Sequence, residues 1–139
     1  MTYVEKDKLG GEKTEDDLQQ MSDHDLLKIS WEGEIFGVGM FEAMAEMYPE
    51  RADESTAGAT MEWFNIHQCE EFGHAAGVHV SLEEAEKLGR QGAELASKNS
   101  WEALAKMVIK ETPEADKMYL QLAKRRRHPR AEGVRGRSR

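Results

Sequence analysis

The chain has 139 residues, of which 39% are hydrophobic and 33% charged, and this composition is typical of one soluble domain with a hydrophobic core. Its longest apolar stretches are a few residues long, which excludes a membrane-spanning helix, and residues 1–17 lack the apolar segment of a secretory signal. The single cysteine, Cys69, excludes an intrachain disulfide and indicates an intracellular, cytoplasmic protein in a reducing compartment.

The N-terminal part predicts a polar arm followed by one long helix. Residues 1–20 are polar and interrupted by glycines, so we expect a loose arm with one short helical turn near residues 16–20. Ser22 is a good N-cap and precedes an acidic first turn. We therefore expect a helix over residues 22–48, ended by Pro49.

The middle of the chain predicts two further helices. A second helix is expected over residues 54–79, and the short turn before it makes the first two helices antiparallel neighbours. Ser81 with Glu84 is a capping box that predicts a third helix over residues 82–97. No segment shows the alternation of apolar and polar residues that is typical of a strand.

The last part of the chain predicts a fourth helix with a break. Asn99 with Glu102 resembles a second capping box and opens this helix. Pro113, preceded by Thr112, is typical of a helix start, so we expect the helix either to kink there or to restart as a fifth helix over residues 113–126.

These elements predict an all-α fold, an up-down antiparallel bundle over residues 21–123 with disordered termini. Residues 124–139 carry eight Lys or Arg and one Glu, a balance of +7, which leaves −15 of the net charge of −8 on the other 123 residues. We expect a disordered basic tail, with contact to an anionic partner such as nucleic acid as the alternative. The tail has no interleaved aromatic residues, which argues against a formed RNA-binding surface.

Glu34 is the first candidate functional residue because it lies in the middle of an apolar stripe. At about 100° per residue, that stripe of the first helix contains Leu27, Trp31, Val38, Phe41 and Ala45. An unpaired carboxylate in a core is too unfavourable to persist, so Glu34 must be protonated, paired or bound to a cation.

The second helix offers partners for Glu34 on one of its two faces. The face expected to point inward contains Thr60, Phe64, His67, Glu71, His74 and Val78, and the other contains Glu62, Asn65, Cys69 and Gly73. If the turn between the helices centres near residue 51 or 52, Glu34 and Glu71 lie almost level. Counting residues in the same way from the centres of the later turns places Glu111 near that height and Glu84 about one turn away. Glycines along both helices indicate a close approach of backbones, for a compact ligand site or for ordinary tight packing.

Glu34 on the first helix and Glu71-x-x-His74 on the second resemble the ferritin-like di-iron carboxylate superfamily over residues 22–79. The resemblance implies a four-helix bundle that binds iron, with manganese or zinc as other metals that suit oxygen and nitrogen ligands. It implies that Glu34 is a terminal ligand, that Glu71 bridges two metals and that His74 supplies an imidazole. It also implies oxidoreductase or ferroxidase chemistry.

The chain departs from that family in one respect, because the only histidine after His79 is His128 and no second Glu-x-x-His exists. Two chains could complete the site in a homo-oligomer, as in encapsulated ferritins. His67 and Glu111, or Glu84, could instead complete an asymmetric site, or the second half could be degenerate. The spacing His67-x-x-x-Glu71 also resembles hemerythrin, whose further helical histidines this chain lacks.

Two other functions stay open from the sequence. One is a non-enzymatic helical bundle that binds a partner and whose buried Glu34 pairs with His67 or His74 without a metal. The other is a ferritin-like hydroxylase acting on RNA, which only the basic tail supports.

Overall fold

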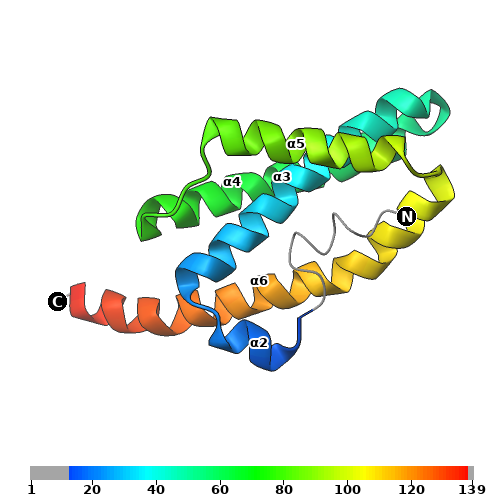
Figure 1. Ribbon diagram of the computed structural model, residues 1–139. Coiled ribbons are helices and arrows are strands. Elements are labelled where there is room, and N and C mark those ends of the chain that lie inside the picture. Colours follow the sequence, from blue (N-terminus) through cyan, green and yellow to red (C-terminus); the bar gives the residue numbers. More distant parts are fainter. Residues whose placement is uncertain (1–12, 138–139) are drawn as a thin grey trace.

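The computed structural model describes residues 13–137, with side chains up to Arg125, and this part of the chain is helical without strands. The all-α prediction is confirmed, whereas the ferritin-like arrangement remains a prediction. No helix in the described range is long and apolar enough to cross a membrane. Labels follow Figure 1, and the elements in chain order are α2 (Glu15–Gln20), α3 (Asp23–Met47), the 3₁₀ turn η1 (Pro49–Arg51), α4 (Ala52–Ala76), α5 (Leu82–Ser97) and α6 (Trp101–Arg137).

The first two helices begin where their capping residues predict. In α2, the Thr14 hydroxyl accepts a hydrogen bond from the Asp17 amide at 3.0 Å, and the Asp17 carboxylate accepts one from the Thr14 amide at 3.1 Å. In α3, the Ser22 hydroxyl accepts a hydrogen bond from the amide of Asp25 at 3.0 Å. The predicted turn near residues 16–20 and the long helix that ends before Pro49 are confirmed.

Helix α4 begins two residues earlier and ends three residues earlier than predicted. Pro49 starts the short η1 turn, which leads directly into α4. Gly77 ends α4 because its backbone adopts the left-handed conformation, with φ of 75°, which suits a residue without a Cβ. The predicted capping box of Ser81 and Glu84 then opens α5.

Helix α6 differs from its prediction at its start, at its middle and at its end. It is capped by Ser100, whose hydroxyl accepts from the Ala103 amide at 3.1 Å, and not by Asn99, whose amide donates to the Leu95 carbonyl at 2.8 Å. The predicted restart at residue 113 is also wrong. Pro113 removes only one backbone donor at an exposed position, so the helix continues. The backbone over residues 124–137 continues α6, where the composition had predicted a disordered tail.

Helix α3 is the central element of the fold. It packs along α4 on one side and along α5 on the other, while α6 crosses nearer to its N-terminal half (Figure 1). Two buried clusters hold these contacts. The α3–α5–α6 cluster contains Phe36, Met40, Met44, Leu95, Ala96, Leu104 and Met107, and the α3–α4 cluster contains Leu27, Trp31, Val38, Ile66, Cys69 and Val78.

Backbone contact between α3 and α5 depends on glycine. A Cβ at Gly92 would overlap the carbonyl oxygen of Phe36, and one at Gly39 would overlap the backbone of Gly89. This close approach of backbones is ordinary tight packing, and it joins α3 to α5, whereas the glycines of α3 and α4 had predicted it between those two helices. It fixes α5 firmly against one side of α3.

Arg125 holds the short α2 helix against α6. Its guanidinium donates to the carbonyls of Leu18 at 2.6 Å and Gln19 at 3.1 Å, and to the carboxylate of Asp23 at 3.1 Å. Cationic donors at the last carbonyls of a helix stabilise its C-terminus. Leu18 is buried in the same contact.

Candidate functional site

Glu34 is buried, as predicted, and its carboxylate is held by side chains from two other helices. Only 6% of its surface is exposed. The hydroxyl of Tyr119 on α6 donates to Glu34 Oε2 at 2.7 Å, and the amide of Asn65 on α4 donates to Oε1 at 3.2 Å. Hydrogen bonds to a charged acceptor are the stronger kind, so this site ties α3, α4 and α6 together.

A second carboxyl group, that of Glu62, shares the site. Glu62 on α4 is hydrogen-bonded to Glu34, and Gly37 makes room for it, because a Cβ there would overlap the Glu62 carboxyl group. Burial raises the pKa of Glu62 to about 10, and its hydrogen bond with Glu34 and the negative charge of that residue act in the same direction. At neutral pH Glu62 therefore carries a proton and donates it toward Glu34.

Two weak acids complete this buried network. Burial, followed by the negative charge of Glu34, raises the pKa of Tyr119 above its ordinary value. Burial also raises the pKa of the Cys69 thiol to about 11, and the Cys69 sulfur lies 3.6 Å from the Tyr119 oxygen. We call Glu34, Glu62, Asn65, Cys69 and Tyr119 the acid-pair network. With both weak acids protonated, it holds one shared proton between two carboxyl groups.

The predicted partners of Glu34 on α4 point the other way. Glu71, His74 and His67 are exposed, and the His67 ring lies 3.2 Å from the carboxylate of Glu70. The expected inward orientation of these three residues is wrong, and so is the pairing of Glu34 with a histidine.

The orientation of α4 follows from the residues that suit a tight interface. Gly73 packs against the Trp31 ring and the carbonyl of Val78, where a Cβ would not fit, and Cys69 is fully buried beside Ile66. Phe64 lies on the opposite face and is 61% exposed. Apolar residues occur on both faces of α4, so periodicity alone did not identify the buried one.

The remaining predicted ligands do not join Glu34 in a metal site. Glu111 on α6 is partly buried, and Glu84 is exposed, where it caps α5 and pairs with Lys28 at 3.7 Å. Within residues 13–125, no group of three or more His, Cys, Asp or Glu side chains is placed to hold a metal ion. The ligand set expected from the sequence therefore does not fit an iron site within one chain.

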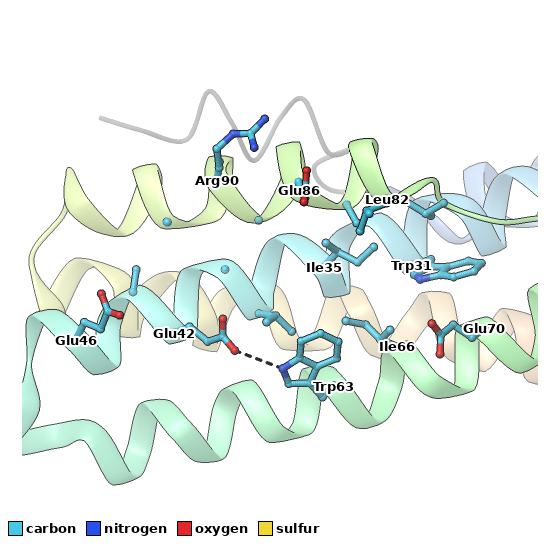
Figure 2. A pocket seen from close by; sticks show the side chains of 17 residues that line it. Trp31, Ile35, Glu42, Glu46, Trp63, Ile66, Glu70, Leu82, Glu86 and Arg90 are labelled. Atoms are coloured by element: carbon cyan, nitrogen blue, oxygen red, sulfur yellow. Dashed lines mark hydrogen bonds between the residues drawn. The ribbon is translucent and has the colours of Figure 1, made fainter.

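A groove lies between α4 and α5 and is floored by α3 (Figure 2). Its volume is about 880 Å³. Apolar side chains form most of its lining, namely Trp31, Ile35, Val38, Ala43, Trp63, Ile66, Val80, Leu82, Ala85 and Ala93. Along α3 it extends from residue 31 to residue 46, a distance of about 22 Å at 1.5 Å per residue.

The rim of this groove is acidic. Four carboxylates line it, and the one cationic side chain in its lining is Arg90. The indole of Trp63 on α4 reaches toward α3 and donates to the Glu42 carboxylate at 3.4 Å (Figure 2). We call this feature the acidic groove, and its rim carboxylates are Glu42, Glu46, Glu70 and Glu86.

Sequence reasoning missed both the acid-pair network and the groove, although one signal pointed to the first. Cysteine and glycine are among the residues most often buried, whereas histidine and glutamate are more often exposed. The face with Cys69 and Gly73 was thus the better candidate for the interior, and Glu62 and Asn65 lie on it. The contact of Glu34 with Tyr119 joins residues far apart in sequence and has no local signal.

Comparison of the chain with protein-family models, with curated proteins and with solved structures gave no match.

Proposed function

We propose that this protein is a non-enzymatic helical interaction module that binds an arginine-rich segment of a partner in the acidic groove. The observation that carries the proposal is the composition of that groove, which is about 22 Å long and is lined mostly by apolar side chains together with four glutamates and one arginine. A concave surface lined mostly by apolar side chains with a few charged groups is the usual form of a binding site.

Arginine suits this lining better than other side chains. Its planar guanidinium pairs with carboxylates and also stacks on aromatic rings, and the groove offers both, in the exposed ring of Trp63 and in the rim glutamates. The balance of −15 outside residues 124–139 would also speed the approach of a basic partner. Trp63 is 46% exposed and would lose this exposure to a bound segment.

The first test uses a synthetic amphipathic peptide of leucine, alanine and arginine. Its binding should shift tryptophan fluorescence to shorter wavelength, because Trp63 becomes covered. Reversing two rim charges, with Glu42→Lys and Glu86→Lys together, should weaken binding at least about ten-fold, or 1.4 kcal/mol.

The matched control changes two exposed glutamates outside the groove, with Glu50→Lys and Glu102→Lys together, so that the net charge changes equally. This control should retain most of the affinity. If both double variants lose the same affinity for the peptide, the effect comes from net charge and not from the groove. If the peptide does not bind the wild type, the proposal is refuted.

A second candidate function is the iron-dependent oxidoreductase or ferroxidase chemistry that the ferritin-like resemblance implies. One observation favours it. His67, Glu71 and His74 lie on the exposed face of α4 together with Met61, which is 64% exposed, and Phe64. A second copy of the chain on this face would bring two such sets together. One chain alone does not fit the metal.

Metal analysis of protein purified without chelator tests this second candidate. It predicts stoichiometric iron, manganese or zinc in a homo-oligomer, and loss of that metal in Glu71→Ala. Glu83→Ala, at an exposed glutamate of α5, is the matched control and should retain the metal. A metal-free wild type, or a metal content that Glu71→Ala leaves unchanged, would exclude the candidate.

A further inference from the structure

We propose that the acidic groove is occupied by residues 126–139 of a second copy of this chain, so that the protein closes its own groove in a homodimer. This inference rests on the proposed function and names the partner. The segment contains six arginines and one glutamate, a balance of +5, and arginine is the side chain that Trp63 and the glutamates of the groove suit best.

The position of this segment makes it available to another molecule. Figure 1 shows the last turns of α6 extending past α2 and beyond the ends of the other helices. To reach the groove of its own chain, the segment would have to leave the axis of α6 and turn back across α3. A second copy can meet it without that change.

Arg125 fixes the point where the segment leaves the body. Its hydrogen bonds to Leu18, Gln19 and Asp23 hold α6 against α2 just before residue 126. A segment with a fixed starting point loses less conformational freedom on binding than a free tail does. A fixed exit point also defines how the two copies are oriented relative to each other in the dimer.

Length and charge agree with this pairing. Residues 126–137 continue α6 and extend about 18 Å as helix, close to the length of about 22 Å that the groove follows along α3. The segment carries six arginines, and the lining of each groove carries four glutamates. If each chain inserts its segment into the other, the assembly is a closed two-fold dimer without free ends.

Sedimentation of the full chain at low and high salt tests the inference. The wild type should be a dimer at low salt and should dissociate as salt rises, because the contacts are ionic. The rim variant Glu42→Lys with Glu86→Lys should be a monomer, and so should the segment variant Arg127→Glu with Arg130→Glu. The chain that carries all four substitutions should also be a monomer, because its groove lining and its segment each carry a net charge of +1.

The control with Glu50→Lys and Glu102→Lys should remain a dimer. A monomeric wild type would overturn the inference, and so would a dimer that persists in both the rim and the segment variants, which would point to the exposed face of α4. A monomer whose basic segment binds single-stranded RNA would overturn it as well.

Two peptides separate failure of this inference from failure of the proposed function. If the amphipathic peptide binds the groove while the wild type is monomeric and a peptide of residues 126–139 does not bind, only the inference fails. If neither peptide binds, both fail. Binding of both peptides, with loss in the rim variant, supports both.

Discussion

Replacing Glu62 by Gln should remove most of the fall in stability that we expect the wild type to show between about pH 5 and about pH 8. The folded protein holds the Glu62 proton up to a pKa of about 10, whereas the unfolded chain releases it near the ordinary value of 4.5. Between these two pKa values, ionisation of Glu62 lowers the free energy of the unfolded state but not that of the folded state. The free energy of unfolding therefore falls as pH rises, by at most about 1.4 kcal/mol per pH unit.

Urea denaturation at several pH values measures this effect. Glutamine keeps the shape of Glu62 and a donor toward Glu34 but has no proton to lose, so Glu62→Gln should show a flatter profile and greater stability than the wild type at pH 8. Glu71→Gln removes an exposed carboxyl group from the same helix and should follow the wild-type profile. Identical profiles for the wild type and Glu62→Gln would show that Glu62 is not buried with its proton.

Capping residues made most of the helix boundaries predictable. Ser22, Ser81 and Pro49 act locally, because each satisfies or removes backbone hydrogen bonds within one turn. Gly77 ended α4 earlier than its apolar pattern suggested, since the pattern continued beyond the backbone signal. Pro113 misled the prediction in the opposite direction, because one missing donor on an exposed side does not end a helix.

The burial of Glu34 was predictable, and its partners were not. Neighbouring apolar residues on one helix fix which side faces the core, so a glutamate among them is buried too. The partner face of α4 depended on packing instead. Gly73 and Cys69 let α4 approach Trp31 closely, and this tight fit outweighed the apolar but exposed Phe64.

The acidic groove could not be predicted from any one helix. It exists because α4 and α5 pack on opposite sides of α3 and leave the strip of α3 from Trp31 to Glu46 between them. Helix contacts of this kind depend on how three elements are placed together. The sequence indicated only the charge distribution, with an acidic body and an arginine-rich end.

Both the acid-pair network and the groove depend on which face of α4 points toward α3. Thiol labelling measures this orientation directly. Cys69 is the only cysteine of the chain and has no exposed surface, so it reports on the inward face. Its labelling at mildly alkaline pH should be more than about a thousand-fold slower in the native protein than in denaturant, because it requires opening of the fold. Glu71→Cys and His74→Cys, each added to the natural chain, report on the outward face.

In each of these two variants, the introduced cysteine should react at a rate within about ten-fold of its rate in denaturant. Cys69 should stay protected. That result would establish that Glu62 and Asn65 face Glu34 while Glu71 and His74 face solvent. Rapid labelling of Cys69 together with protection of the cysteines introduced at positions 71 and 74 would contradict it. The helix would then be turned the other way, and neither the acid pair nor the groove wall at Trp63 would exist as described.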